Sequence, residues 1–211
     1  MTIMVMSDTE SAAIWDHYQP GKLAGIDLIL ACGDLSPHYL SFVETFSNVP
    51  VLYVHGNHDE KYAATPPDGC FCIEDDIYVH NGVRILGLGG SMRYRPGAHQ
   101  YTEWEMRRRV RKLWWKLKRH GGFDILITHA PAMGLHDGDD LCHRGFDVFR
   151  TLLEQYHPKY FIHGHVHMNY GQRTPRLCMT GDTVVINAYR TFVFDYEDAA
   201  LTERASLCCV N

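Results

Sequence analysis

Short apolar runs alternate with amphipathic segments in the first half of the chain. The apolar runs Ile3–Met6, Ile26–Cys32 and Val51–Val54 are typical of buried strands. The segments between them, from about Ser11 to Tyr18 and at His38–Phe46, carry apolar residues at helical spacing. Strands that alternate with helices in this way favour a parallel sheet covered on both faces.

The middle of the chain departs from this alternation. Glu60–Asp76 contains two prolines and a glycine and is predicted to be an irregular loop. Two short apolar runs follow, Ile77–Val79 and Val83–Leu88, and they flank the pair Asn81-Gly82. Because Asn-Gly is a strong hairpin signal, we expect part of the sheet to be antiparallel.

The longest predicted helix runs from about Thr102 to His120 and ends at Gly121-Gly122. One of its faces carries, at helical spacing, Met106, Val110, Leu113, Trp114 and Leu117. Three of the four tryptophans lie on this helix, and we expect them in the core or in an interface. The later elements are predicted as a strand at Phe123–Thr128, a helix at Phe146–Tyr156, a strand at Tyr160–His163 and a terminal pair of strands at Thr183–Asn187 and Thr191–Asp195.

Length and composition indicate one soluble domain. The chain has 211 residues without a repeat or a linker, so we expect one domain over residues 1–195 and a poorly patterned tail over 196–211. A net charge of −5, with 45% hydrophobic and 21% charged residues, gives no whole-chain field that attracts nucleic acid or an anionic membrane. No apolar run is long enough for a membrane span, and the first residues lack the basic region of a signal peptide.

Cysteine usage points to a reducing compartment. The seven cysteines are scattered and form no C-x-x-C motif, which indicates reduced thiols and a cytoplasmic protein. A zinc site built on Cys70 and Cys72 is an alternative that this spacing disfavours.

Side chains that can bind metals follow five of the predicted strands, at the point where each strand ends. These residues are Asp8 and Glu10, Asp34, Asn57 and His58, His129, and His165 and His167. The carboxyl ends of the strands form the ligand crevice of open α/β sheets, so the five clusters can converge although they span most of the chain. Carboxylate, amide and imidazole donors without a thiolate suit Mn²⁺, Fe²⁺ or Zn²⁺.

The order and wording of these segments resemble the calcineurin-like metallophosphoesterase family. The matching motifs are D-T-E at 8–10, G-D at 33–34, G-N-H-D at 56–59, T-H-A-P at 128–131 and G-H-V-H at 164–167. The resemblance runs from residue 2 to about 195 and implies a single-domain, mixed-sheet α/β fold with four layers, α/β/β/α. It also implies an enzyme that hydrolyses a small phosphomonoester or phosphodiester.

The resemblance further implies a role for each residue. The ligands of two divalent metals would be Asp8, Glu10 and His167 for the first, Asn57, His129 and His165 for the second, and Asp34 as the bridge. A hydroxide between the metals would attack phosphorus, because two cations depress the pKa of a bound water. His58 would lie near the leaving oxygen as a general acid or a transition-state donor.

The sequence departs from the family pattern at two positions. Glu10 stands where the family usually has His; as a ligand it would favour Mn²⁺ or Mg²⁺, and the alternative is that it points to solvent and the first metal is lost. Pro37 stands where an extended motif has an Asp that orients the catalytic His, so His58 would need another partner, such as Asp59 or a backbone carbonyl. These departures keep a second function open, a protein-binding scaffold that has the fold without the activity.

Two basic features allow further partners. Arg107–Arg119 holds eight basic residues that could bind nucleic acid, but they fall mostly opposite the apolar face, which favours a solvated outer face. His143 and Arg144 could bind the substrate phosphate, and an ordinary helix-entry loop is an equal alternative. Arg93 and Arg95 are weaker candidates of the same kind. The sequence does not fix the oligomeric state.

Overall fold

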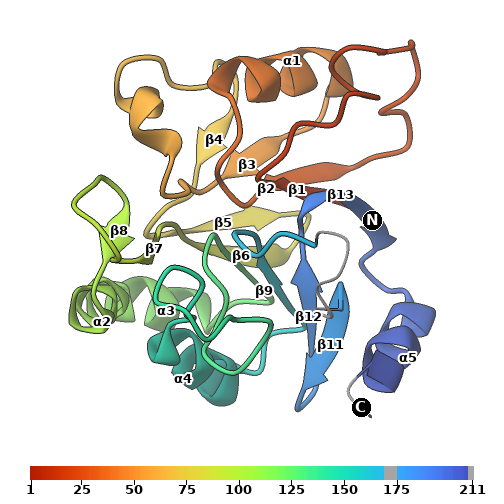
Figure 1. The fold of residues 1–211 in the computed structure, drawn as a ribbon. Coiled ribbons are helices and arrows are strands. Elements are labelled where there is room, and N and C mark those ends of the chain that lie inside the picture. Colours follow the sequence, from red (N-terminus) through yellow and green to blue (C-terminus); the bar gives the residue numbers. More distant parts are fainter. Residues whose placement is uncertain (169–174, 209–211) are drawn as a thin grey trace.

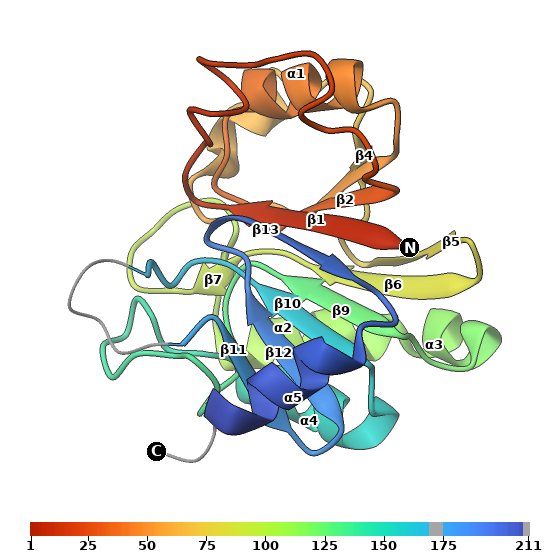
Figure 2. The same cartoon turned by 90° about the vertical axis from the view of Figure 1, so that its right-hand side faces the viewer.

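The computed structural model describes residues 1–168 and 175–208, which form four layers (Figure 1). Two sheets face each other across a shared apolar core, helix α1 covers the outer face of one sheet, and helices α2 to α4 cover the outer face of the other. Figure 2 shows the same layers from the side. The predicted mixed-sheet α/β fold with four layers is therefore confirmed.

The first sheet has five strands. In spatial order they are β13 (Arg190–Asp195), β1 (Thr2–Ser7), β2 (Leu28–Ala31), β3 (Val51–Tyr53) and β4 (Phe71–Cys72). Strands β1 to β4 run parallel, and β13 is antiparallel to β1. Side chains of α1 (Pro37–Ser47) pack on this sheet, and Pro37 stands at the start of the helix, where its missing N–H costs no hydrogen bond.

The helix predicted from about Ser11 to Tyr18 is wrong. The segment forms hydrogen-bonded turns, in which the N–H groups of Ile14 and Trp15 both donate to the carbonyl of Ser11. Pro20 and Gly21 follow directly, so the segment offers too few turns to repay the cost of helix nucleation.

The second sheet has six strands. In spatial order they are β11 (Leu177–Thr180), β12 (Thr183–Asn187), β10 (Tyr160–His163), β9 (Ile125–Thr128), β6 (Val83–Leu88) and β5 (Asp76–His80). The predicted hairpin is present: β5 and β6 are antiparallel, and Asn81 and Gly82 both have positive φ. The predicted terminal pair is wrong, because β12 pairs with β10 in this sheet whereas β13 pairs with β1 in the other.

The long helix is divided in two. Helix α2 (Glu103–Lys112) begins with a capping box between Thr102 and Glu105, and α3 (Trp114–His120) follows after Leu113. Both helices pack with α4 (Asp147–Tyr156) on the second sheet. The three tryptophans of the predicted long helix are largely exposed, so a core position is wrong for them, and the interface given as the other expectation stays a prediction.

The remaining elements lie in the connections and at the C-terminal end. The 3-10 helix η1 (Asp59–Ala63) lies in the predicted irregular loop, and β7 (Ser91–Met92) pairs with β8 (Gln100–Tyr101). The predicted tail forms helix α5 (Ala199–Cys208) instead, and its Leu201 and Ala205 belong to the core between the sheets. No helix in the described ranges has the length and apolar character that crossing a lipid bilayer demands.

The packing of α5 can be tested with Leu201→Ala. The Leu201 side chain is only 1% exposed, so we expect its truncation to lower the free energy of unfolding by about 2–5 kcal/mol. The neighbouring Thr202→Ala is the matched control, because Thr202 is exposed and its change should stay within about 0.5 kcal/mol. Urea unfolding measures both values. Equal values for the two variants would show that α5 does not belong to the folded core.

Candidate metal centre

The ends of the central strands place three of the predicted metal ligands in an unusual backbone conformation. Asp8 follows β1, Asp34 follows β2 and His165 follows β10, and all three have positive φ, at 65°, 56° and 65°. Asp and His tolerate this left-handed region better than bulky or β-branched residues do. Such turns redirect the chain at the sheet edge and turn the side chains towards one another, which is typical of functional sites.

Two glycines next to these turns allow close approach of the backbone. A Cβ atom on Gly56 would overlap the Asp34 carboxylate, and a Cβ atom on Gly164 would lie 2.7 Å from the Ser7 side chain. Neither glycine has a positive φ, so glycine is required at these positions because a side chain would not fit, and not because the backbone is left-handed. The left-handed positions fall on the metal-binding residues themselves.

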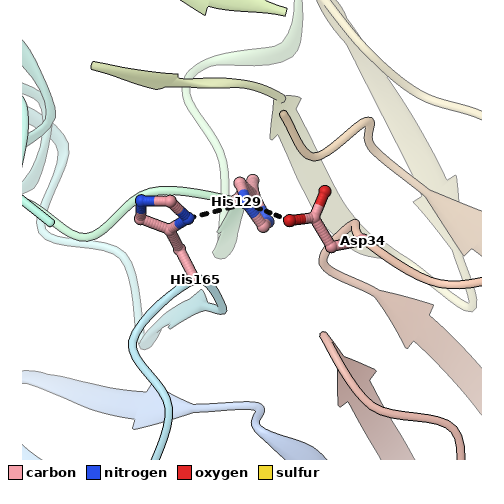
Figure 3. Close-up of side chains that lie close together, drawn as sticks. All are labelled: Asp34, His129 and His165. Atoms are coloured by element: carbon pink, nitrogen blue, oxygen red, sulfur yellow. Dashed lines mark hydrogen bonds and ion pairs between the residues drawn. The ribbon is translucent and has the colours of Figure 1, made fainter. Parts of the chain in front are cut away.

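Four side-chain atoms converge on one point. His129 Nε2 lies 3.0 Å from Asn57 Oδ1, 3.0 Å from His165 Nδ1 and 3.4 Å from Asp34 Oδ2. Figure 3 shows His129 between Asp34 and His165. His129 and Asn57 are fully buried, so these contacts are shielded from solvent. The residues come from the ends of four different strands and were all predicted to share a site.

The other nitrogen of each imidazole ring determines what the ring presents to this point. His129 Nδ1 is 2.7 Å from the carbonyl oxygen of Cys32, and His165 Nε2 is 2.7 Å from that of Cys142. A carbonyl only accepts hydrogen bonds, so both of these nitrogens are the donors. In neutral rings, His129 Nε2 and His165 Nδ1 therefore carry lone pairs that face each other beside Asn57 Oδ1 and the Asp34 carboxylate.

A divalent cation fits this arrangement. Facing lone pairs repel each other and lack a shared proton donor, whereas a cation satisfies all four. Two imidazole nitrogens, an amide oxygen and a carboxylate suit Mn²⁺, Fe²⁺ or Zn²⁺. The carbonyls of Cys32 and Cys142 orient the rings in the way that outer partners orient metal-binding histidines.

The electrostatics agree with a site built for positive charge. Burial alone would raise the pKa of Asp34, but the adjacent His129 outweighs it and holds the pKa well below its ordinary value. Burial lowers the pKa of His129, yet the Asp34 carboxylate raises it to about 9. For His165, burial and the neighbouring His129 both lower the pKa, to about 4. A proton held by Asp34 and His129 thus stands in for part of the charge that a metal would supply.

A second set of donors adjoins the first. His167 Nε2 lies 3.7 Å from Asp8 Oδ1, and the Asp8 carboxylate also accepts the N–H of His165 at 3.0 Å. The adjacent Asp8 carboxylate raises the pKa of His167. Members of both sets line one cavity of about 280 Å³, which we call the donor cavity. Its lining residues are Asp8, Asp34, Asn57, His58, Cys142, His143, His165 and His167. Members of both sets therefore face the same cavity, and Asp34 is among its lining residues.

Glu10 lies apart from these donors. Its carboxylate accepts the N–H of Ser36 at 2.9 Å, just before α1, where a negative charge is favoured by the helix dipole. Glu10 lines a neighbouring cavity of about 210 Å³ that shares Asp34 and His58 with the first. Its role as a metal ligand stays a prediction.

His58 stands between the two cavities. Its backbone N–H donates to Asp34 Oδ1 at 2.8 Å, and its exposed side chain lines both spaces. Asp59 does not orient it: Asp59 Oδ2 accepts the N–H groups of Asp34 and Gly56. Burial raises the pKa of Asp59 to about 6, and this carboxylate holds the two turns that carry Asp34 and Asn57 together.

The two predicted substrate-binding residues differ in position. His143 lines the donor cavity, with its ring 5.4 Å from that of His165 and its Nδ1 held by Asp140. Arg144 is exposed and is not among the lining residues. The structure therefore brings His143 to the site and leaves Arg144 outside the cavity.

Sequence reasoning missed Tyr94 and two backbone carbonyls. Asn57 Nδ2 donates to the Tyr94 hydroxyl at 3.4 Å, which places the loop between β7 and β8 beside the donors. The Gly-Leu-Gly-Gly turn before this loop is the signal that the sequence offers, and the loop residues predicted from it were Arg93 and Arg95. The carbonyls of Cys32 and Cys142 could not be predicted, because every residue type has a backbone carbonyl.

This four-layer sandwich with metal donors at one sheet edge matches a known class of protein. A family model described as calcineurin-like phosphoesterase matches residues 1–169. The chain therefore belongs to the calcineurin-like phosphoesterase family, and the predicted resemblance is confirmed.

Solved structures show the same fold at low identity. The protein TT1561 of Thermus thermophilus is similar with a TM-score of 0.61 and 18% identity, over 90% of this chain and 89% of that one. The calcineurin-like phosphoesterase YfkN from Bacillus subtilis is similar with a TM-score of 0.53 and 13% identity, over 92% and 83%. No curated protein sequence matches the chain.

Metal binding at Asp34 can be measured by thermal unfolding. In the metal-free protein, Mn²⁺ at about a hundredfold above its Kd should raise Tm by roughly 5–10 °C, because a ligand that binds only the folded state stabilises it. Asp34→Asn should lose most of this rise, since it removes the carboxylate that lies 3.4 Å from His129 and lines the cavity. Asp182→Asn, in the exposed turn between β11 and β12, is the matched control and should keep the full rise. An unchanged rise in Asp34→Asn would place the metal elsewhere.

Proposed function

We propose that this protein is a metal-dependent phosphoesterase that hydrolyses a phosphomonoester or phosphodiester of a small molecule. The observation that carries the proposal is the convergence of His129 Nε2, His165 Nδ1, Asn57 Oδ1 and Asp34 Oδ2 on one point, where a metal ion in place of the proton would be bound by all four atoms. Membership of the calcineurin-like phosphoesterase family supports the same chemistry.

The proposed ligands fall into two groups that share Asp34. Asn57, His129 and His165 would hold one divalent ion, and Asp8 and His167 the other. Bound there, two ions would act as Lewis acids on a phosphoryl oxygen and activate a water nucleophile. The donor set favours Mn²⁺, Fe²⁺ or Zn²⁺, because it offers oxygen and imidazole nitrogen and no thiolate.

The chain's own residues would position the ester and its leaving group. The phosphoryl group would lie in the donor cavity, where His143 would contact its oxygens and the Tyr94 hydroxyl would hold Asn57 in position through their hydrogen bond. The leaving group would lie towards the second cavity, since His58 stands between the two spaces. His58 is then placed to give a proton to the leaving oxygen as the bond to phosphorus breaks.

The acid role of His58 predicts a dependence on the leaving group. His58→Asn should slow hydrolysis of an alkyl phosphate by about 10²–10⁴-fold, because an alkoxide needs a proton in order to leave. Hydrolysis of p-nitrophenyl phosphate should fall far less, since p-nitrophenolate leaves without one. Metal content should not change, because the His58 side chain is not one of the proposed ligands. Equal losses on both esters would exclude the acid role.

The role of Glu10 can be decided by counting metals. We expect Glu10→Ala to keep both metals, because the carboxylate bonds to the Ser36 N–H and lies outside the donor cavity. Loss of its interaction at the start of α1 should cost about 1 kcal/mol of stability. Elemental analysis after dialysis gives the metal content, and urea unfolding gives the stability. Loss of one metal would instead establish Glu10 as a ligand.

The alternative function, a scaffold without activity, makes an opposite prediction for the same preparation. Protein purified with Mn²⁺ is assayed on p-nitrophenyl phosphate and on bis-p-nitrophenyl phosphate. The enzyme should turn over at least one of these esters and lose this activity in Asp34→Asn. Bound metal without turnover on either ester would favour the scaffold.

A further inference from the structure

The outer side of α2 and α3 carries a stripe that the metal centre does not use. The Trp–cation stripe consists of Trp104, Arg108, Arg111, Lys112, Trp115 and Arg119. Steps of three or four residues, from 104 to 108, then to the adjacent pair 111 and 112, then to 115 and 119, line them up along one side of the helical segment. The opposite side carries Met106, Leu113 and Leu117, which are buried against the second sheet. The stripe therefore faces away from the protein core.

A solvated outer face explains the cations of this stripe but not its indoles. Trp115 is 71% exposed, Trp104 is 62% exposed and the adjacent Trp114 is 50% exposed. Scattered apolar residues on a surface are ordinary, but three exposed tryptophans within twelve positions form a patch. Trp114 and Trp115 contact each other edge to face, and cations lie over all three rings: Arg108 over Trp104, and Lys118 over both Trp114 and Trp115.

The cations of the stripe, and Lys118 beside it, lack acidic partners. None of Arg108, Arg111, Lys112, Lys118 and Arg119 forms an ion pair within residues 1–168 and 175–208. The other basic residues of the two helices do: Arg107 pairs with Glu103 and Asp147, Arg109 with Glu74 and Asp75, and Lys116 with Asp76. The positive charge on these helices is thus divided into a satisfied set that holds the fold and an unsatisfied set that faces outwards.

An apolar groove opens beside the stripe. It has a volume of about 550 Å³, and Val110, Leu117, Leu152 and Tyr156 contribute apolar surface to it. The rest of its lining comes from Arg111, Lys112, Gln155 and the two adjacent tryptophans. Aliphatic side chains offer nothing to the polar edge of a nucleic-acid base, whereas they are a good environment for hydrocarbon.

We propose that the Trp–cation stripe docks the protein on the surface of an anionic lipid bilayer. Indole rings are enriched at the level of lipid headgroups, because they combine an apolar body with one polar N–H. Lysine and arginine are attracted to anionic headgroups, and the apolar groove receives hydrocarbon next to them. A chain with a net charge of −5 is repelled in most orientations, so this stripe also fixes which side meets the membrane.

The test uses the full chain and vesicles of defined composition. One set contains phosphatidylcholine alone, and the other contains equal parts of phosphatidylcholine and phosphatidylglycerol. Co-sedimentation measures binding, and the blue shift of tryptophan emission reports transfer of the indoles into the headgroup region. We expect binding to the anionic vesicles only, and we expect added salt to weaken it because the attraction is electrostatic.

Variants separate the stripe from the charge of the chain as a whole. Arg111→Gln/Lys112→Gln should weaken binding by about 25-fold, since each cation at an anionic surface contributes about fivefold. Lys22→Gln/Arg204→Gln removes the same charge from exposed positions outside the stripe and should bind as the unchanged protein does. Trp115→Ala should weaken binding and reduce the blue shift. All three variants should keep the same unfolding midpoint and metal content, because the changed residues are exposed.

Three results would overturn the proposal. The first is no binding to the anionic vesicles, and the second is an equal loss in both double variants, which would reduce the effect to net charge. The third is tighter binding of a single-stranded oligonucleotide that displaces the vesicles and depends on Arg111, Lys112 and Trp115. That result would assign the stripe to nucleic acid.

Discussion

The hydrogen bond from His129 Nδ1 to the Cys32 carbonyl fixes the character of the whole metal centre. It makes Nδ1 the donor and leaves Nε2 to face Asn57, Asp34 and His165. Cys32 stands at the end of β2, where Gly33 and Asp34 turn with positive φ, so the same few residues orient the imidazole and supply the carboxylate. The centre is therefore a product of backbone geometry at the sheet edge as much as of its side chains.

The space available at this sheet edge restricts the residues of the turns as strongly as hydrogen bonding does. The turns after β2 and β3 lie so close that a side chain on Gly33 or Gly56 would overlap the neighbouring turn. The buried Asp59 carboxylate accepts an N–H from each turn, which compensates for the closeness of the two segments. The motif G-N-H-D thus contributes a space, a proposed ligand, a proposed proton donor and a clamp in four successive residues.

The sequence predicted the parts of the fold that depend on local patterns. Apolar runs gave the central strands to within a few residues, Asn81-Gly82 gave the hairpin, and the family motifs gave the residues that converge. The errors arose where tertiary contacts decide. Helix α5 has no strong apolar face, and it forms because Leu201 and Ala205 fill the edge of the core between the sheets. A pattern of residue types likewise cannot show three other features. These are the pairing of β13 with the first sheet, the hydrogen bond from the Ser36 N–H to Glu10, and the carbonyls that orient the histidines.

Charged and polar groups mark the two places where the protein is proposed to bind other molecules: the sheet edge, and the outer side of α2 and α3. Most buried charges are satisfied internally, as for Arg109 between Glu74 and Asp75, and these pairs hold elements together. At the sheet edge, carboxylate and amide oxygens converge with imidazole nitrogens, and this donor set calls for cations. On α2 and α3 the groups are cations among indoles, which calls for an anionic and partly apolar surface.

The two places are separate but joined by one loop. In Figure 2, β7 and α3 lie on opposite sides of the molecule, so the stripe extends away from the metal centre. Its near end adjoins the loop between β7 and β8, because Arg93 in that loop pairs with Glu105 of α2. The next residue, Tyr94, accepts a hydrogen bond from Asn57 in the centre. A membrane surface bound along α2 and α3 would therefore leave the donor cavity open at the sheet edge. The same surface would contact α2, the helix that holds the Tyr94 loop in place.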